Sequence, residues 1–469
     1  MVIRCDNCKI LEARINELEA RCAFLEQQVK ELLAKLSSNS SNSHRPPSSD
    51  FPKKSTKSSK NRSKDSGKRK RRPGISRTAL EPDDVTEFVG VHPSLCSHCG
   101  ATLEKMPSTD TQVSQHIDLP KELELDVIEL HRSVVCCPCC GKSTCAPFPE
   151  GLSRKLVGNR LAAFISILRP KFHLSVRHIQ DFLQMLFGNK GKISLGTISN
   201  IEFSTGRASK EVYQSARNYI EEQESIWVDE TGWYNPTMRP WLWVASVPNL
   251  SFFQISQSRS QIALKKLIGN YSGFLTSDRW SSYSTYPLHR RQLCLSHLLR
   301  DFQKVEDQNM GSEHLGKQGV IELKNAMLIW NNYREKRINK KQLNILIRPI
   351  RGRFKILLTK GLISESKFMK TLSKSLLKKW EAIWMFCKHP DKVEPTNNRA
   401  ERALRQHVIW RKISQGTKSI NGICFAQRLM TISTTLKQQK RNLLEFIEKM
   451  LVNFKAGLPP PLLTEQNTI

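Results

Sequence analysis

The 469-residue sequence has no long apolar run. No stretch approaches the roughly 18 apolar residues of a membrane-spanning helix, so we expect no membrane partner. The amino terminus, MVIRCDNCKI, reaches charged residues at once and lacks the apolar core of a secretory signal. These absences predict a cytoplasmic chain, in which the 13 cysteines serve as thiols or metal ligands rather than in disulfides.

Acidic residues are also scarce relative to basic ones. The chain has 43 Asp and Glu against 74 Lys and Arg, a net charge of +31. Such a surface attracts a polyanion, although a ribosomal or other RNA-binding protein would show the same balance. The length leaves room for two or three domains.

Residues 1–36 carry a heptad pattern. Apolar residues fill the two core positions of each heptad: Leu11, Leu18, Leu25 and Leu32 in one, and Ile15, Cys22, Val29 and Leu36 in the other. The pattern predicts a short coiled coil through which the chain forms a homo-oligomer, or else a single helix folded back on its own protein. Cys5 and Cys8 precede it and stay unassigned.

Residues 37–80 change abruptly in composition. Between His44 and Arg72 there are 12 Lys or Arg against Asp50 and Asp65, about +10 in charge, with Ser and Pro and almost no apolar residues. Such a segment cannot bury enough surface to fold, so we expect a disordered linker. It serves as a tether and can also lie along DNA phosphates.

Residues 81–150 contain two Cys-x-x-Cys-Gly motifs. Cys96 and Cys99 form the first pair, and Cys137 and Cys140 the second; Cys136 and Cys139 overlap the second pair and leave its register open. Four thiolates suit a closed structural Zn²⁺ site. With strands expected at 115–117 and 125–132, the segment is predicted to be a zinc-binding ribbon domain.

Residues 151–224 are predicted to be helical. Leu161–Leu186 has helical period, and two helices, 174–182 and 193–200, are expected on either side of a turn at 188–191. A helix-turn-helix that reads DNA and a plain supporting bundle explain this pattern equally well.

Acidic residues follow two apolar, β-prone runs. In SIWVDETGWY, residues 225–234, Asp229 and Glu230 come where the run 226–228 stops, and in GFLTSD the run ends at Asp278. Between them we expect strands at 239–247 and 251–256 and a helix at 261–268. The strand-end pattern does not choose between Asp229 and Glu230, and a strand followed by an acidic turn has the same local sequence.

A third acid belongs to a later helix. Thr396 is expected to cap this helix, with Glu401 in its second turn. Two strand-end aspartates and a helical glutamate could converge on two hard cations about 4 Å apart, as used for phosphoryl transfer. Mg²⁺ takes oxygen ligands and keeps several waters, which suits such a set.

These motifs resemble those of a known family. SIWVDETGWY, TSDRWSSY, RRQLCLSHLLRDF and NNRAERALR, followed by SQGTKSINGICFAQRLMTISTTLKQQKRNLLEF, are similar to the DDE transposases of the insertion sequence 66 family. The resemblance implies an α/β, multidomain protein whose RNase H-like catalytic core, residues 225–435, has a helical insertion at about 300–390 and is followed by a C-terminal helix and tail, 436–469. It selects Asp229 over Glu230 and implies that Asp229, Asp278 and Glu401 are the metal-binding triad.

The resemblance also implies a mechanism and partners. The activity would be metal-dependent cleavage and strand transfer of double-stranded DNA, at element ends and at a target, with Mg²⁺ or Mn²⁺ at the triad and accessory transposition proteins as further partners. It places the protein in the bacterial cytoplasm with the nucleoid. His297 would lie near the scissile phosphate, although a core histidine has the same sequence signature. A non-catalytic zinc-ribbon DNA-binding protein and a nuclease acting on RNA hybrids stay open as alternatives.

Overall fold

The computed structural model describes residues 6–36, 79–108, 110–149, 157–308, 311–414 and 416–464. The protein is mixed α/β, with a helical majority and a mixed sheet. Two compact units can be separated, residues 52–126 and the remainder of the chain. The predicted linker 37–80 falls almost wholly outside the described residues. None of the described helices combines the length and the apolar character needed to cross a membrane.

The central sheet has five strands in the order β5-β4-β3-β6-β7. Its strands are β3 (Ser225–Gly232), β4 (Trp241–Ser246), β5 (Ser251–Ser256), β6 (Phe274–Ser277) and β7 (Arg291–Leu293). β3, β4 and β5 pair antiparallel, whereas β3, β6 and β7 pair parallel. The predicted strands are present, but β3 does not stop at Val228. Pairing with β4 continues to Gly232, so Asp229 and Glu230 lie inside the strand.

Apolar side chains cover both faces of this sheet. Ile226 and Val228 point to one face and pack with α5 (Lys210–Glu221) and α6 (Gln261–Ile268). Trp227 points to the other face, where α13 (Asn398–Ser414) and α14 (Ile420–Gln439) cover it. The two-residue alternation of a strand therefore decides which helices each side chain meets.

The helices before the sheet form a group with the last helix. They are α2 (Asn159–Phe172), α3 (Val176–Phe187) and α4 (Leu195–Ala208), which pack around a small core with α15 (Leu443–Ala456) against α2 and α4. The segment 161–186, predicted to be helical in period, is divided between α2 and α3, because His173 adopts a left-handed conformation and Ser175 caps α3. The turn predicted at 188–191 is a short 3-10 helix, η3 (Gly188–Gly191). The predicted boundary at 435/436 falls inside α14, which continues to Gln439.

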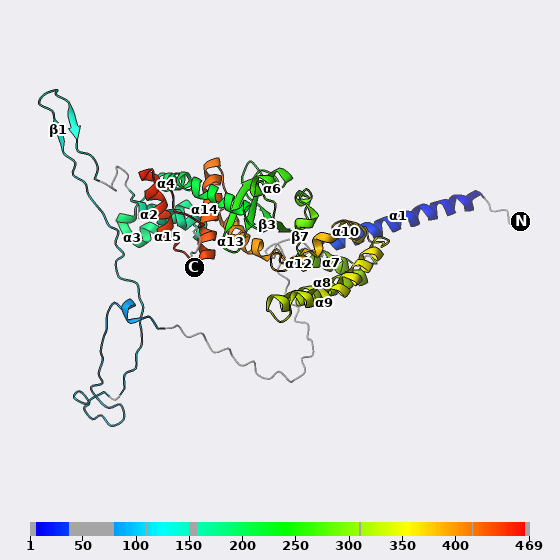
Figure 1. Ribbon diagram of the computed structural model, residues 1–469, viewed down its shortest axis with the longest axis horizontal. Helices are drawn as coiled ribbons and strands as arrows, with labels where there is room; N and C mark the ends of the chain where they lie inside the picture. The colour runs from blue at the N-terminus through cyan, green and yellow to red at the C-terminus, as the bar shows by residue number, and fades with distance from the viewer. Residues whose placement is uncertain are drawn as a thin grey trace. The chain divides into compact units, whose positions relative to one another are not determined.

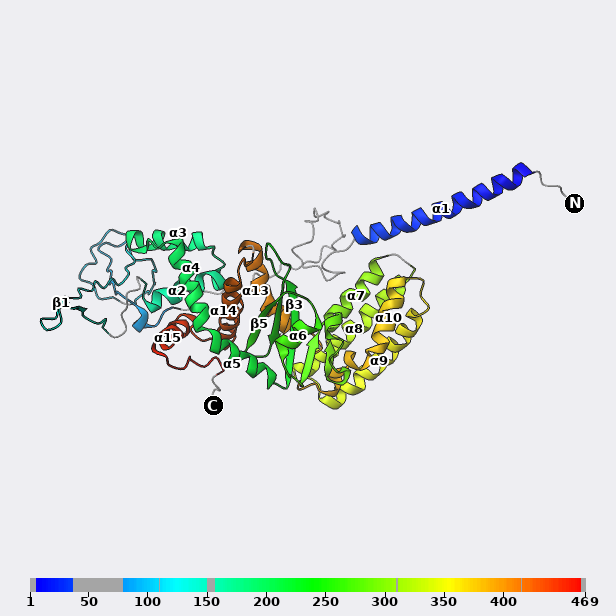
Figure 2. The same ribbon diagram turned by 90° about the horizontal axis from the view of Figure 1, so that it is seen from above.

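The predicted insertion is helical. It contains α7 (Leu295–Asp307), α8 (Glu313–Arg334), α9 (Lys340–Gly361), α10 (Lys367–Lys378), α11 (Trp380–Ile383) and α12 (Met385–Lys388). Helices α7 to α10 pack in sequence against one another around their own apolar core (Figure 2). Two 3-10 helices, η4 (Ser281–Tyr283) and η5 (Leu288–Arg290), precede it.

The amino-terminal helix α1 (Asp6–Leu36) carries the predicted heptads (Figure 1). The leucine, isoleucine and valine side chains at its core positions from Leu11 to Leu32 are exposed, from 47% at Leu18 to 62% at Leu11. The structure therefore leaves this apolar seam uncovered within a single chain.

The cysteine-rich region has different strands from those predicted. Residues 115–117 and 125–132 are outside strands, and the short strands are β1 (Val134–Cys136) and β2 (Ser143–Cys145), an antiparallel pair flanking the second cysteine motif. A single bridge joins Leu95 to Thr102 around the first motif. A short 3-10 helix, η2 (Pro82–Asp84), precedes them. Within the described residues 79–108 and 110–149, β-sheet hydrogen bonding is confined to the segments that flank the two cysteine turns.

Candidate active site

Asp229 and Asp278 come from neighbouring parallel strands. The last pair of residues between β3 and β6 is Trp227 with Thr276. Counting two residues onward reaches Asp229 on β3 and Asp278 immediately after β6. Since side chains two residues apart on a strand share a face, Asp229 belongs to the face that α13 covers. Asp278 follows the end of β6, and its carboxylate lies 3.6 Å from Arg259, which also binds Glu230. The strands are about 4.8 Å apart at this point.

Glu230 points the other way, into a different set of contacts. Its carboxylate accepts hydrogen bonds from Arg259, at 2.6 Å, and from the Tyr283 hydroxyl. Burial and the charge of Asp278 raise the pKa of Glu230 to about 7, although Arg259 and Tyr283 oppose the rise. The two adjacent acids thus point to opposite faces of β3. Glu230 is bound by Arg259 and Tyr283, whereas Asp229 lies on the side of Glu401.

Arg259 also reaches the second aspartate. Its Nη2 lies 3.6 Å from Asp278 Oδ2, while its guanidinium lies over the Trp280 ring at 3.8 Å. Backbone bonds fix the aspartate itself, because the Trp280 N–H donates to Asp278 Oδ1 at 2.9 Å and Arg291 donates to the Asp278 carbonyl at 2.8 Å. The orientation of Asp278 is therefore set by a rigid turn after β6.

Asn397 positions the helix that carries Glu401. The Asn397 side chain is fully buried, and its Nδ2 donates to the Val228 carbonyl at 2.9 Å, beside Asp229. Its backbone N–H donates to Cys294 Sγ at 3.2 Å. The helix α13 begins at Asn398, one residue later than a Thr396 cap requires, and Glu401 lies in its first turn rather than its second. Asn397 was not predicted as a functional residue, although it is part of the NNRAE motif.

The three acids share one electrostatic environment. Burial, followed by the negative charges of Glu230, Asp278 and Glu401, raises the pKa of Asp229 well above its usual range. A carboxylate whose pKa is raised by neighbouring negative charges binds a proton or a cation favourably, because either relieves the repulsion. Asp229, Asp278 and Glu401 are therefore a set of oxygen donors that could hold divalent cations.

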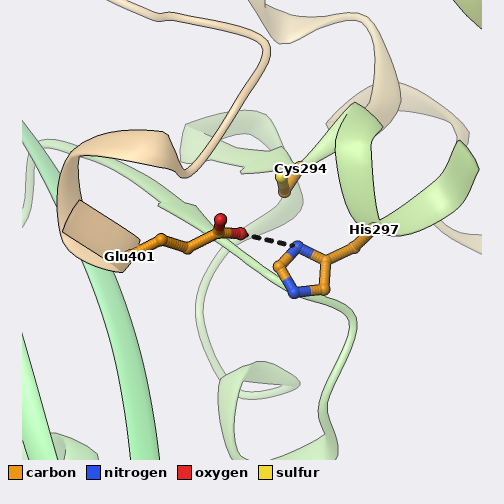
Figure 3. Close-up of side chains that lie close together, drawn as sticks. All are labelled: Cys294, His297 and Glu401. Carbon is orange, nitrogen blue, oxygen red and sulfur yellow. Dashed lines mark ion pairs between the residues drawn. The ribbon is translucent and has the colours of Figure 1, made fainter. Parts of the chain in front are cut away.

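Glu401 also lies beside a histidine and a cysteine (Figure 3). The ligand atoms of Cys294, His297 and Glu401 are all within 4.8 Å of one another, and His297 Nδ1 is 3.6 Å from Glu401 Oε1. Arg300 reaches the same oxygen at 3.4 Å. Burial, followed by the charge of Glu401, raises the pKa of Cys294 to about 11, and its Sγ accepts a hydrogen bond from the Asn397 N–H. The structure thus brings His297, from the first turn of α7, to the glutamate.

The two cysteine motifs form turns of the same geometry. The N–H of Gly100 donates to the Cys96 carbonyl and that of Gly141 to the Cys137 carbonyl, each at 2.9 Å. Both glycines have positive φ, 76° and 66°, which suits a residue without a side chain. Backbone N–H groups of the turn lower the pKa of both Cys96 and Cys137, with those of His98 and Cys140 contributing most.

The second turn matches the first residue by residue from Cys137 to Gly141. Cys137 occupies the position of Cys96, whereas Cys136 belongs to β1 and donates to the Gly141 carbonyl. The two motifs belong to the separate units 52–126 and 127–469. Each turn therefore directs backbone N–H groups at the thiol of its own first cysteine.

Comparisons with known proteins address the carboxyl-terminal part of the chain directly. The model of the IS66 transposase family matches residues 154–424, more than half of the chain, including all three acids and the insertion. Residues 3–79 match a family of unknown function, DUF6444. A search of curated proteins found no match. The family match agrees with the resemblance carried by the sequence motifs, and the chain belongs to the IS66 family of transposases.

Proposed function

We propose that this transposase cuts and joins DNA at the acids Asp229, Asp278 and Glu401, which hold two Mg²⁺ or Mn²⁺ ions. When bound, the ions would supply Lewis-acid activation of the attacking oxygen and stabilisation of the leaving oxygen in an in-line displacement. The observation that supports the proposal is that Asp278, which follows β6, and Glu401, on α13, lie near enough to Asp229 on β3 for their charges to raise its pKa.

An RNase H-like core is the fold that we propose for residues 225–435. In a single sheet, β5, β4 and β3 pair antiparallel and β3, β6 and β7 pair parallel. The strand that comes first in the sequence, β3, lies at the centre of the sheet. The central strand contributes Asp229, and its parallel neighbour leads into Asp278. This arrangement supports a core in which the catalytic acids are fixed by the sheet rather than by mobile loops.

Cations around the acids would orient the phosphodiester. Arg259 bridges toward Asp278 on one side, and Arg300 reaches Glu401 on the other. On α13, Arg402 and Arg405 are exposed and point away from the sheet. Guanidinium groups bind phosphate oxygens in a fixed geometry, so these side chains would hold the DNA strand while the acids act on one phosphate.

The insertion would hold the flanking duplex. Helix α9 has seven Lys or Arg and no acidic residue, and six of the seven are exposed: Lys340, Lys341, Arg348, Arg353, Lys355 and Lys360. Helix α10 presents four exposed lysines at helical spacing: Lys367, Lys370, Lys374 and Lys378. Such surfaces bind duplex phosphates without reading sequence, and their affinity falls as salt rises.

Zinc and self-association complete the proposal. Cys96, Cys99, Cys137 and Cys140 would hold a structural Zn²⁺, and the matching turns support this register over Cys136 and Cys139. The exposed seam of α1 would pair with that of a second chain as a coiled coil. A dimer suits a reaction in which two element ends are cut in one complex.

The decisive experiment is strand cleavage of DNA that carries the element's ends. We expect nicking by the wild-type protein with Mg²⁺ or Mn²⁺, and its loss in Asp229→Ala, Asp278→Ala and Glu401→Ala. The control is Glu211→Ala, which removes an exposed acid on α5. Equal cleavage by wild type and Asp229→Ala would refute the assignment. DNA binding by the wild-type protein without any cleavage would favour a non-catalytic DNA-binding protein.

A further inference from the structure

A hollow of about 780 Å³ opens between the sheet and the insertion helices. Trp227 of β3 and Arg399 of α13 line one side, and the end of α8 with the turn into α9 lines the other. Trp227 precedes Asp229 by two residues, about 7 Å along a strand, and Arg399 precedes Glu401 by two residues on α13. The hollow therefore shares β3 and α13 with the candidate active site. Its volume falls within the range of about 300–1,000 Å³ found for small-molecule sites.

Positive charge prevails in the hollow. Its cations are Arg334, Lys336, Arg337, Lys392 and Arg399, against the acids Asp391 and Glu394. Lys392 pairs with Glu224, and Arg399 with Glu394. Arg334 and Lys336 are exposed and have no acidic partner within ion-pair distance among the described residues. Two cations are thus left for an anionic ligand such as a phosphate.

Aromatic rings provide the rest of the lining. The Tyr333 hydroxyl donates to Asp391 Oδ1 at 2.5 Å, and the Tyr333 ring lies 5.5 Å from that of Trp330. Trp330 is in turn held edge-on against Phe386 at 5.6 Å. Tyr333 is therefore fixed at its hydroxyl and packed along its ring, with little side-chain entropy left to lose on binding.

An anchored aromatic ring beside unpaired cations is the arrangement that binds single-stranded nucleic acid, with a base on the ring and phosphates on the cations. We propose that the hollow binds one unpaired nucleotide of the DNA strand that enters the candidate active site. The base lies against Tyr333, and the adjoining phosphates lie on Arg334 and Lys336. This inference rests on the proposed function, because it takes the strand at the three acids to be DNA.

Binding to two labelled duplexes tests the proposal. One duplex is blunt and the other carries a short single-stranded tail, and affinity is measured by fluorescence anisotropy at fixed salt with EDTA present. We expect the wild-type protein to prefer the tailed duplex by about 10-fold, the scale of one base stacked on an aromatic ring. Tyr333→Ala should lose this preference, whereas Tyr333→Phe, which retains the ring, should keep it. A 2-aminopurine in the tail should be quenched by wild type and by Tyr333→Phe only.

A charge-matched pair of variants controls for general electrostatics. The double variant Arg334→Ala/Lys336→Ala should reduce the preference for the tailed duplex. The control Lys317→Ala/Lys324→Ala removes two exposed cations of α8 outside the hollow and should lower the affinity for both duplexes to the same extent. Equal affinity of the wild-type protein for both duplexes, or equal loss of preference in both double variants, would overturn the proposal. Displacement of the tail by excess free dAMP would show a free-nucleotide site and overturn the assignment to a DNA strand.

A negative result in this binding assay can be distinguished from a negative result in the cleavage assay that tests the proposed function. The assay contains no divalent ion and needs no cleavage, so Asp229→Ala should retain the tail preference. A protein that cuts DNA but ignores the tail refutes the hollow alone. A protein that prefers the tail but cuts nothing refutes the catalytic assignment alone.

Discussion

The variant Asn397→Ala should lower the rate of DNA cleavage by more than its effect on the stability of the fold explains. Parallel pairing between β3 and β6 ends at Trp227, and the Asn397 Nδ2 donates a hydrogen bond of 2.9 Å to the next carbonyl of β3, that of Val228. Asn397→Ala leaves this buried acceptor without its donor, which costs about 1–3 kcal/mol of the free energy of unfolding. At about 2–4 °C per kcal/mol, the melting temperature should fall by about 2–12 °C.

The effect on cleavage should be much larger than the loss of stability explains. Asn397 directly precedes α13, so losing its bond frees the first turn that holds Glu401 over Asp229. A displacement of about 1 Å at a reacting centre can cost about 100-fold in rate. We expect Mg²⁺-dependent cleavage by Asn397→Ala to fall by that factor at a temperature where the variant remains folded.

A matched control isolates this positional effect. Thr205→Val removes the 2.8 Å hydrogen bond between Thr205 and Ser166, also fully buried, between α4 and α2. It should lower the melting temperature to a similar extent without a comparable loss of cleavage. Differential scanning fluorimetry and end-labelled DNA cleavage measure the two effects. Asn397→Ala cutting as fast as Thr205→Val would show that the Asn397 bond does not position Glu401.

Three further predictions concern other parts of the chain. Burial, followed by the charge of His173, lowers the pKa of His407 to about 3, so the unfolded chain binds its proton more tightly and stability should fall as pH drops below about 6.5. His407→Gln should remove about 2 kcal/mol of the loss in the free energy of unfolding between neutral pH and pH 5 and so flatten the decline in melting temperature. A wild-type melting temperature that does not depend on pH would contradict this prediction. Cys140→Ser should lower the bound zinc measured by mass spectrometry, whereas Cys139→Ser should not; the opposite result would favour the alternative register. Leu18→Glu with Leu25→Glu places charge in the exposed seam of α1 and should shift the mass measured by light scattering from oligomer toward monomer.

Local sequence patterns predicted many elements of the central sheet and of the insertion. Apolar, β-prone runs marked the strands 239–247 and 251–256 closely, because each is bounded by turn residues and buries a continuous apolar face. The helix 261–268 has the predicted limits, and the insertion is helical throughout most of its length. The failures lie where local signals compete. Residues 115–117 and 125–132 have β-prone composition, but the structure gives them no partner strand among the described residues.

The sequence by itself determined which acids were candidates, their order along the chain and the family to which the motifs belong. Only the tertiary structure decided that Asp229, rather than Glu230, faces Glu401, because the direction of a side chain depends on sheet pairing and on which helix covers each face. It also decided the contacts of Asn397, Arg259 and Tyr283, which join positions more than 25 residues apart. Such contacts arise from how strands and helices pack together, and a local pattern of residues carries no record of them.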